Sequence, residues 1–354
     1  MRMKTDWLLF MTILGMVSFG LVFVCSSSSV VAEERFHAGS LYFFLRQAGA
    51  AVFAFVALMF LAKLDYRHLK SAQWAFLPLG VVVVLLITVY FADPRAHRWL
   101  PLGIFTVQPS EFAKPALALF LAWFVTQRAP DINGRHTLLP AAMAMVVLAG
   151  AVVVADLGTA VVLIFTAAAV FYVAGLEQRY VRLACLASAA LMVVAVIAQP
   201  YRLKRIQQFV EGDGTNYQAL QSRIAVGSGG LFGQGIMKGN QKLFYLPEAH
   251  TDFIYAVVGE ELGLFGAALL LAGFVIILWR GTRLYWNALD DFGRYLAVGI
   301  TVSIVFQALM NMSVALEIAP TKGIPLPLIS YGGSSLVSTM LSLGLLLSVS
   351  RRAR

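Results

Sequence analysis

One carboxylate of this 354-residue sequence stands where a long polar segment meets an apolar run. Asp252 directly precedes that run, within the segment LPEAHTDFIYAVVGEELGL. A carboxylate at a membrane face is costly unless it is solvated, paired or in use, so Asp252 is a functional-site candidate, and proton transfer is the chemistry it offers. The alternative interpretation is that Asp252 caps the following helix and interacts with its dipole.

The polar segment before Asp252 is rich in cations. Residues 199–251 contain Arg202, Lys204, Arg205, Arg223, Lys238 and Lys242. A connection this long is usually functional or disordered, and its many aromatic and aliphatic residues argue against disorder. Around 217–226 it is amphipathic, which predicts a helix lying on the outer membrane face. The cations either attract anionic lipid head groups or contact a polyanionic substrate.

A second charged pair lies inside an apolar run. Glu111 and Lys114, in VQPSEFAKP, are three residues apart and share one helix face. A lysine within a membrane is costly unless it is paired or lines a wet cavity. The pair is therefore either structural or part of a substrate site.

Other polar residues have equally open interpretations. Asp156 falls in a tight turn between two apolar runs, where an Asx-turn is the simple explanation. Gln307 belongs to a polar stripe with Ser303 and Asn311, which more often joins helices than binds ligands. Arg46 and His250 are further polar candidates.

The segment PLPLISYGGSS places glycines directly before the last apolar run. Exposed backbone N–H groups at such a helix start suit a phosphate, although a helix-breaking turn would look identical. The substrate-binding candidates in this part of the chain are Lys322, Ser330, Gly332 and Gly333. The earlier glycine run GSGGLFGQG lacks the nucleotide-binding spacing and predicts a tight turn.

Composition identifies the elements that must position these residues. The chain is 60% hydrophobic and 13% charged, whereas soluble domains carry about 25% charged residues. We predict an all-α integral membrane protein with one domain, 1–354, and a large extracytoplasmic loop, about 199–251, between helices 7 and 8. The ten predicted transmembrane helices are 7–26, 42–62, 74–91, 111–126, 138–154, 157–175, 181–198, 253–279, 295–316 and 334–349.

Charge and residue usage set the orientation and exclude some sites. Arg2 and Lys4 precede the first run, which lacks a signal-peptide cleavage site and is predicted to be uncleaved. Basic residues in the short loops predict that both termini are cytoplasmic. Two cysteines in apolar runs and five scattered histidines argue against a disulfide framework and a zinc site.

Four sequence blocks together resemble the SEDS family of bacterial cell-wall polymerases. They are QPSEFAKP, SRIAVGSGGLFGQG, LPEAHTDFIYAVVGEELG and TKGIPLPLISYGGSS, and they span nearly the whole chain in order. The blocks KLFYLPEAHTDF and PTKGIPLP are more similar to the division member, FtsW, than to the elongation member, RodA.

The resemblance implies a peptidoglycan glycosyltransferase that moves the growing glycan chain from its undecaprenyl-pyrophosphate carrier to lipid II. It implies action at the outer face of the bacterial cytoplasmic membrane, at the division septum. Asp252 matches the family's acidic position and would be the general base, while Lys114 and Arg223 would offset pyrophosphate charge. A pyrophosphate leaves as a stable anion, so the carboxyl pair of a glycosidase is not needed.

The same resemblance implies partners and leaves alternatives. A class B penicillin-binding protein transpeptidase and other divisome membrane proteins are expected, and nucleic acid is not. The candidate cofactor is a divalent cation, Mg²⁺ or Mn²⁺. An elongation-type polymerase, a lipid II flippase and a non-catalytic scaffold stay open as alternatives. Small residues on the eighth and ninth spans predict a lipid-facing partner surface: Gly266, Ala267, Gly273 and Gly299.

Overall fold

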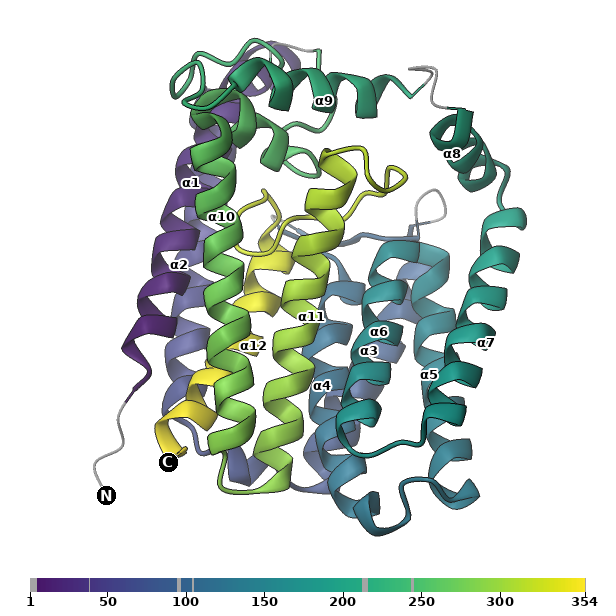
Figure 1. Cartoon of the computed structure of the whole chain (residues 1–354). Coiled ribbons are helices and arrows are strands. Elements are labelled where there is room, and N and C mark those ends of the chain that lie inside the picture. Colours follow the sequence, from purple (N-terminus) through teal and green to yellow (C-terminus); the bar gives the residue numbers. More distant parts are fainter. Residues whose placement is uncertain are drawn as a thin grey trace.

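The computed structural model describes residues 5–37, 39–93, 97–103, 105–211, 216–242 and 245–353. Arg2, Lys4 and Arg354, which carry part of the predicted orientation, lie outside the described residues. The described chain is mostly helical (Figure 1). Its α-helices are α1 (Trp7–Phe36), α2 (Tyr42–Lys63), α3 (Ala72–Ala92), α4 (Pro109–Arg128), α5 (Arg135–Ala155), α6 (Leu157–Val173), α7 (Gln178–Ile197), α8 (Pro200–Glu211), α9 (Tyr217–Gly229), α10 (Ile254–Asn287), α11 (Asp291–Ala315) and α12 (Gly333–Arg352).

The predicted α-helical membrane architecture is confirmed in its coarse form. Within the described residues, eight helices are long and apolar enough to cross a membrane: α1, α2, α3, α5, α7, α10, α11 and α12. The other two predicted spans correspond to α4, which carries Glu111 and Lys114, and to α6, which has 17 residues. The count of ten spans therefore stays a prediction.

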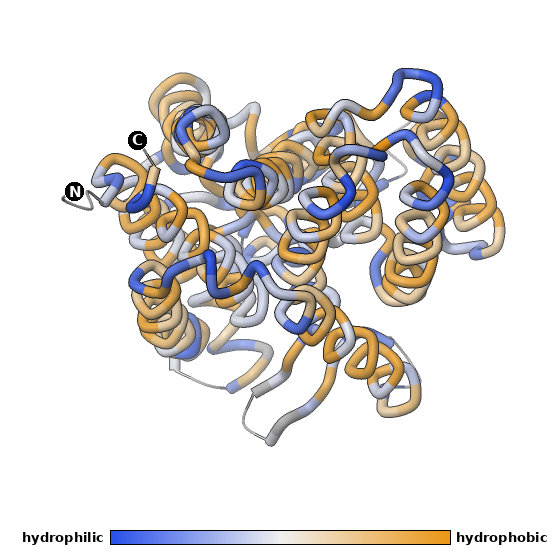
Figure 2. Tube along the Cα trace, turned by 90° about the horizontal axis from the view of Figure 1, so that it is seen from below, coloured by the Kyte–Doolittle hydropathy of each residue, from blue (hydrophilic) through white to orange (hydrophobic). Residues whose placement is uncertain are grey.

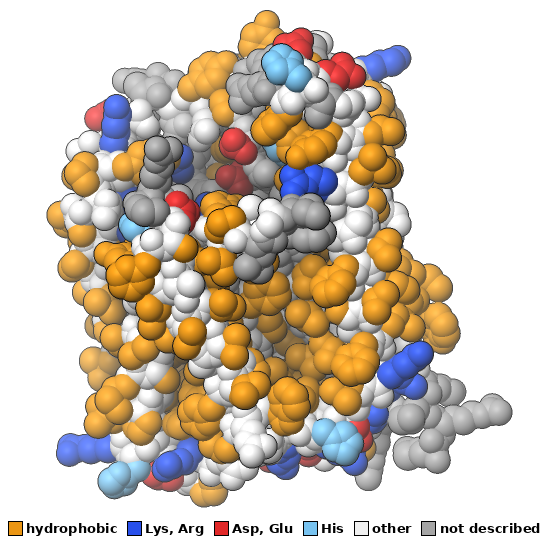
Figure 3. Space-filling view, turned by 180° about the vertical axis from the view of Figure 1, so that it is seen from behind, with side chains coloured by type: hydrophobic (Ala, Val, Ile, Leu, Met, Phe, Trp, Pro, Cys, Tyr) orange, Lys and Arg blue, Asp and Glu red, His pale blue; other side chains and the backbone are white. Residues whose placement is uncertain are grey.

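The surface has the pattern of a membrane protein. Seen along the helix axes, hydrophobic residues dominate the helical turns and hydrophilic residues gather in the connections (Figure 2). From the side, a hydrophobic band separates charged side chains at the two ends (Figure 3). The start of α1 and the end of α12 lie at the lower end of Figure 1, whereas α8 and α9 lie at the upper end.

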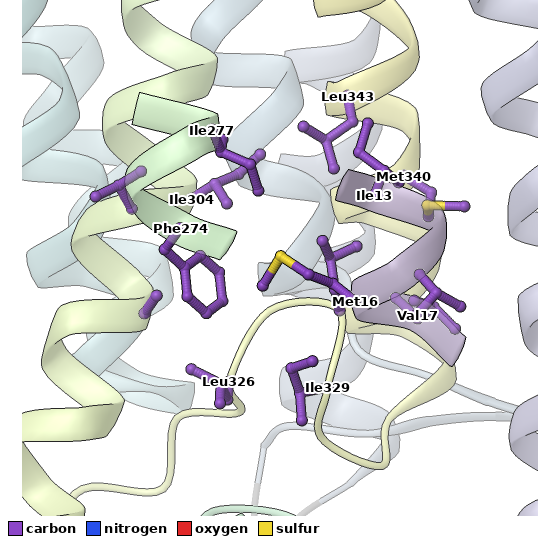
Figure 4. Close-up of a cluster of buried hydrophobic side chains, with 14 of the residues drawn as sticks. Ile13, Met16, Val17, Phe274, Ile277, Ile304, Leu326, Ile329, Met340 and Leu343 are labelled. Atoms are coloured by element: carbon purple, nitrogen blue, oxygen red, sulfur yellow. The ribbon is translucent and has the colours of Figure 1, made fainter. Parts of the chain in front are cut away.

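The helices pack around α12 and α11. α12 packs on α2 and α4, while α11 packs on α10, α4 and α6. One part of the core joins side chains of α1, α10, α11, α12 and the segment before α12 (Figure 4). Within its most apolar window, α12 has 83% of its residues buried and α7 has 6%, so α7 lies at the edge of the bundle.

Two short strands were not predicted. β1 (Leu100–Leu102) pairs antiparallel with β2 (Phe105–Val107), with Leu100 opposite Val107. Two short 3₁₀-helices, Tyr66–Leu69 and Ala129–Asp131, lie between helices. The hairpin connects α3 to α4 and contacts α12. Its first strand begins two residues after Arg98.

The long connection between α7 and α10 contains two helices. The predicted helix near 217–226 is present as α9, which begins at Tyr217. Its N-cap is Asn216, whose side-chain oxygen accepts from the Ala219 N–H at 3.4 Å. α9 lies crosswise over α10 and α11 in Figure 1. The Ser222 hydroxyl donates to the Ala315 carbonyl at 2.6 Å, so α9 is docked on the end of α11.

α10 is broken at Gly263, whose φ of 64° lies outside the helical region. The glycine run that predicts a tight turn packs against this break. The Leu264 N–H donates to the Gly230 carbonyl at 2.9 Å, and the Gly235 N–H donates to the Glu261 carbonyl at 2.9 Å. A Cβ at Gly233 would lie 2.1 Å from the Glu261 carbonyl oxygen, so only glycine allows this close backbone contact.

The predicted partner surface of small residues is wrong. Gly266, Ala267, Gly273 and Gly299 are all buried. Gly273 faces Met16 of α1, and Gly299 faces Ala118 of α4. Small residues allow helices to approach closely, and here the close neighbours are helices of the same chain.

Candidate functional site

Asp252 lies just before α10 and does not cap it. α10 begins after Phe253 and has no side-chain cap, so the capping interpretation of Asp252 is wrong. The Asp252 backbone carbonyl instead accepts a hydrogen bond from Nδ2 of Asn311, at 2.8 Å. Asn311, on α11, thereby holds the turn that carries the carboxylate.

Arg98 and Gly323 lie beside the Asp252 carboxylate. A Cβ built on Gly323 would lie 3.0 Å from Oδ2 of Asp252 and 3.5 Å from Nη1 of Arg98. Nη2 of Arg98 donates to the Gly323 carbonyl at 2.9 Å and lies 3.5 Å from Oδ2 of Asp156. The guanidinium therefore lies between two carboxylates that are far apart in the sequence.

Burial raises the pKa of Asp252 from 3.8 to about 7. Arg98 opposes this rise, and the negative charges of Glu248 and Asp156 reinforce it, while Arg205 lowers the pKa slightly. Asp252 as a residue is neither buried nor fully exposed, so it is not sealed off from solvent. A carboxylate with a pKa near 7 is suited to accept a proton at neutral pH.

Asp156 has the local role that its turn predicts and also faces the site. Its Oδ1 accepts from the Gly158 N–H at 2.9 Å, and its Oδ2 accepts from the Thr159 hydroxyl at 2.8 Å, so it caps α6. The same carboxylate pairs with Arg98. The charge of Asp156 also acts on Lys322. Burial lowers the pKa of Lys322, and the negative charge of Asp156 partly offsets that decrease.

The segment between α11 and α12 is held to its surroundings by polar side chains. Nδ2 of Asn311 donates to the Ile324 carbonyl at 2.7 Å, and Nε2 of Gln307 donates to the Pro325 carbonyl at 2.8 Å. The Ser330 hydroxyl donates to the Thr251 carbonyl at 2.5 Å. Ser330 thus ties this segment to the residue before Asp252.

The two glycines at the start of α12 lie at the same end of the molecule. The Gly332 N–H donates to Oε1 of Gln47 on α2 at 3.1 Å, so this N–H already has a protein partner. Gly333 is the first residue of α12. Phosphate binding at these glycines stays a prediction.

Glu111 and Lys114 form a buried pair. Nζ of Lys114 lies 2.7 Å from Oε2 of Glu111 and 2.5 Å from Oε1 of Gln307. Glu111 is fully buried and Lys114 is 6% exposed. Through Gln307 the pair reaches Pro325, so Lys114 supports the segment that borders Asp252.

The remaining predicted residues lie around this centre. Arg223 is 62% exposed and its Nη1 pairs with Oε2 of Glu317 at 3.1 Å. Arg46 donates to the Tyr42 hydroxyl at 2.7 Å on α2. The His250 ring packs against the rings of Phe43 and Tyr331.

Sequence reasoning missed two cations at the site. Arg98 was overlooked because it lies in AHRWLPLG, in the connection between two apolar runs, with no periodic pattern around it. Arg205 appeared only as one basic residue among several, but its Nη1 donates to the Thr321 carbonyl at 3.0 Å. Arg98, Arg205 and Lys322 are therefore the cations that contact or adjoin the segment beside Asp252.

A second cluster of carboxylates lies further along α10. Oε1 of the buried Glu261 is 2.6 Å from Nζ of Lys242, and both of its oxygens accept from the Ser26 hydroxyl, at 2.7 and 2.8 Å. Oε2 of Glu261 also accepts from the Met237 N–H at 3.0 Å. Glu260 accepts from the Asn240 N–H at 2.7 Å.

A hollow opens at the upper end of the face seen in Figure 3, and acidic and basic side chains gather in it above the hydrophobic band. Within the described part of the chain, no three His, Cys, Asp or Glu side chains are grouped to hold a metal ion. A divalent cation held by the pyrophosphate of a substrate would not need such a cluster, and it stays a prediction.

Comparison with known proteins identifies the family. The model of the FtsW, RodA and SpoVE family, described as cell cycle proteins, matches residues 6–354. The chain belongs to the SEDS family. A probable peptidoglycan glycosyltransferase FtsW of Trichlorobacter lovleyi is 37% identical over 98% of this chain and 93% of that protein. Stage V sporulation protein E of Bacillus subtilis is 36% identical over 100% of this chain and 99% of its own length.

Solved structures show the same SEDS fold. A structure described as the structural coordination of polymerization and crosslinking by a peptidoglycan synthase complex matches with a TM-score of 0.80 and 28% identity, over 98% of both chains. The rod shape determining protein RodA of Thermus thermophilus matches with a TM-score of 0.73 and 27% identity, over 99% of this chain and 98% of that one. The protein is therefore a multi-pass SEDS glycosyltransferase.

Proposed function

We propose that this SEDS protein polymerises peptidoglycan by transferring a glycan chain from its polyprenyl-pyrophosphate carrier to lipid II, with Asp252 as the general base. The observation that carries the proposal is the partly covered Asp252 carboxylate, with a pKa raised to about 7, beside Arg98 and Gly323. The relatives named as probable peptidoglycan glycosyltransferases support the reaction type.

The reaction needs one base and several cations. Asp252 accepts the proton of the acceptor sugar hydroxyl as that oxygen bonds to the anomeric carbon of the donor. The bond from this carbon to the pyrophosphate breaks, and the electron pair leaves with the pyrophosphate. Arg98, Arg205 and Lys322 offset the charge that develops on the leaving group, so no side chain has to protonate it.

The other predicted residues take supporting roles in this proposal. Lys114, with Glu111 and Gln307, holds the segment that carries Lys322 and adds positive charge beneath it. The backbone around Ser330, Gly332 and Gly333 borders the substrate at the opposite edge, with Arg46 and His250 nearby. Arg223 contributes its positive charge at the outer edge of the proposed site. A divalent cation, Mg²⁺ or Mn²⁺, would enter with the pyrophosphate.

We also propose ten spans in a single membrane domain, 1–354, of the bacterial cytoplasmic membrane. α4 and α6 complete the set, both termini are cytoplasmic, and residues 199–251 are outside. Reporter fusions after Asp213, which lies outside the described residues, and after Arg354 should report opposite compartments. If both report the same side, the span count is wrong by an odd number.

The proposed partner is a class B penicillin-binding protein, with other divisome proteins at the septum. The neighbour structure of a synthase complex that coordinates polymerization and crosslinking supports a transpeptidase partner. The resemblance of the blocks KLFYLPEAHTDF and PTKGIPLP to FtsW supports division over elongation. Depletion in cells separates these two roles, because loss of a division enzyme blocks septation and loss of an elongation enzyme rounds the cells.

Purified protein and lipid II in detergent provide the deciding test of the reaction. A polymerase, with or without its cognate transpeptidase, forms glycan strands that a gel resolves. A flippase or a scaffold leaves lipid II unchanged, because neither forms a bond. Strands made by the wild type and absent with Asp252→Asn support the proposal, whereas no strands under any of these conditions contradict it.

A further inference from the structure

Two apolar grooves lie on the helical surface, and a lysine lines one of them. The first, of about 200 Å³, follows α11 and the turn after it. Its lining consists of Phe306, Leu309, Met310, Ser313, Val314, Ala319, Pro320 and Lys322. The second, of about 330 Å³, lies on α10 and is lined by Phe232, Leu262, Phe265, Gly266 and Leu269. Only the first has a cation in its lining.

We propose that the first groove binds the start of the isoprenoid chain of a lipid-linked substrate, with its pyrophosphate at Lys322. This inference rests on the proposed function, and it names where that substrate's lipid enters. The groove is called the α11 groove below, and the groove on α10 is called the α10 groove.

The α11 groove ends at a residue that adjoins the candidate site in the sequence. Lys322 lines the groove, and the next residue, Gly323, lies against Oδ2 of Asp252 and accepts from Arg98. In this proposal, a molecule with its apolar chain in the groove has its first charged group at Lys322, one residue before the Gly323 that Arg98 contacts. That is where a pyrophosphate must lie if the bond to it breaks within reach of Asp252.

The size and direction of the groove fit an apolar chain. Phe306 and Val314 are eight residues apart on α11, and at 1.5 Å per residue the groove follows the helix for about 12 Å. Leu309 is 46% exposed, so its side chain is open to the membrane. The ring of Phe306 stacks on that of Phe165 of α6, with 3.9 Å between the ring centroids, so two packed aromatic rings form one side of the groove.

The edge of the bundle beside the groove is open. α7 follows α6 and has few buried residues, with α6 and α8 as its neighbours. A lipid can therefore approach α6 and α11 sideways from the bilayer. Ordinary phospholipid tails would fill any lipid-facing groove, so the charge at Lys322 is the feature that distinguishes a dedicated substrate site.

The test uses photolabelling of the full chain in nanodiscs. The probe is a polyprenyl diphosphate with a photoreactive diazirine on the prenyl units nearest the diphosphate. Labelling of wild type should map to α11 between Phe306 and Val314. Leu309→Trp and, independently, Ser313→Phe fill the groove and should reduce labelling about tenfold, the change that corresponds to about 1.4 kcal/mol.

The α10 groove supplies the matched control. Leu269→Trp adds the same bulk to an exposed leucine of an apolar groove without a cation, and it should leave labelling unchanged. Lys322→Met should reduce labelling by the diphosphate probe and not by a polyprenol of equal length. Equal labelling by diphosphate, polyprenol and a diazirine phospholipid, with no effect of Lys322→Met, would identify an ordinary lipid groove and overturn the proposal.

Asp252→Asn separates this inference from the proposed reaction. It should label like wild type while making no glycan strands. If wild type makes no strands but the labelling pattern holds, the reaction fails and the groove stands. If strands form and the labels map elsewhere, the groove fails and the reaction stands.

Discussion

Asp252 and Glu261 belong to the same stretch of chain, and the structure treats them in opposite ways. Glu261 is fully buried, and Lys242, Ser26 and the Met237 N–H together satisfy both of its oxygens. Asp252 is partly open, and its neighbouring cation, Arg98, is shared with Asp156 and the Gly323 carbonyl. A carboxylate whose oxygens are all engaged stabilises a fold, whereas one held beside a shared cation can still accept a proton.

The two carboxylates are nevertheless connected. Glu260 and Glu261 bind the backbone of the segment that packs on the break at Gly263. Because the helix is broken there, the first turns of α10 need not continue along the axis of the rest. Asn311 then holds the Asp252 carbonyl against α11. The structural carboxylates thus help to place Asp252, the proposed base.

The largest expected effect is the loss of activity in Asp252→Asn, which distinguishes the role of Asp252 from that of Glu261. Asp252→Asn preserves shape and should lower the rate of strand formation by about 10²- to 10⁴-fold, because the amide cannot accept the proton. Its thermal unfolding temperature should be no lower than that of wild type, since Asp252 caps no helix. Gel analysis of glycan strands and a melting curve in detergent test this. A well-folded variant with near-wild-type turnover would remove Asp252 from the mechanism.

Breaking the structural cluster should mainly cost stability. Lys242→Met leaves Glu261 buried without its cation and should destabilise the protein by about 3–5 kcal/mol. The double variant Lys242→Met with Glu261→Leu removes both charges and should recover part of that loss. Melting temperatures of the singles and the double measure the coupling. The activity of the folded fraction should fall far less than with Asp252→Asn, and an equal fall would contradict the division of roles.

Lys114→Met should lower activity less than Asp252→Asn does and more than Lys242→Met does. It leaves Glu111 unpaired and releases Gln307, so both stability and the placement of the segment around Lys322 should suffer. We expect turnover to fall about tenfold, a change of about 1.4 kcal/mol in the barrier. Gln307→Leu is the matched control, because it removes the link to Pro325 and keeps the ion pair. If Gln307→Leu retains full turnover, Lys114 does not act through this link.

The pKa of Asp252 predicts opposite pH trends for activity and stability. Strand formation should rise with pH through a midpoint of about 7, because only the ionised carboxylate is a base. The folded pKa lies above the unfolded one, so the folded state binds more protons between about pH 4 and 7. The contribution of Asp252 to stability is therefore largest below about pH 4 and is lost as pH rises through about 7. Asp252→Asn should remove this contribution to the slope, and an unchanged slope would assign it elsewhere.

The smallest expected effect is a shift in the pH midpoint of activity in Asp156→Asn, which tests the second carboxylate beside Arg98. Asp156→Asn keeps an oxygen to cap α6, so stability should change by less than about 1 kcal/mol. It removes a negative charge that raises the pKa of Asp252 and frees Arg98 to approach it. The activity midpoint should therefore move to lower pH. A midpoint that moves upward would contradict the proposed coupling.

The sequence predicted the helices well and the contacts between them poorly. Apolar runs placed the helices because burial in lipid requires long uninterrupted segments. Glu111 and Lys114 were predicted as a pair because three residues bring side chains together on one helix face. Gly273 of α10 and Gly299 of α11 were assigned to lipid, and they face α1 and α4 instead. Periodicity shows that a helix has a small-residue face, and it carries no information about which neighbour that face meets.

By itself, the sequence determined the class of protein, the family and the positions of most helices, and it singled out Asp252 as a candidate residue. These follow from local composition and from blocks of adjacent residues. Only the tertiary structure brought Arg98, Asp156 and Gly323 to Asp252, and only it placed Glu261 on Lys242 and Ser26. Such groups meet because helices distant in sequence pack together, and electrostatic effects depend on those distances in space. The break at Gly263 was also hidden, because a single glycine within an apolar run is compatible with an unbroken helix until another segment packs on it.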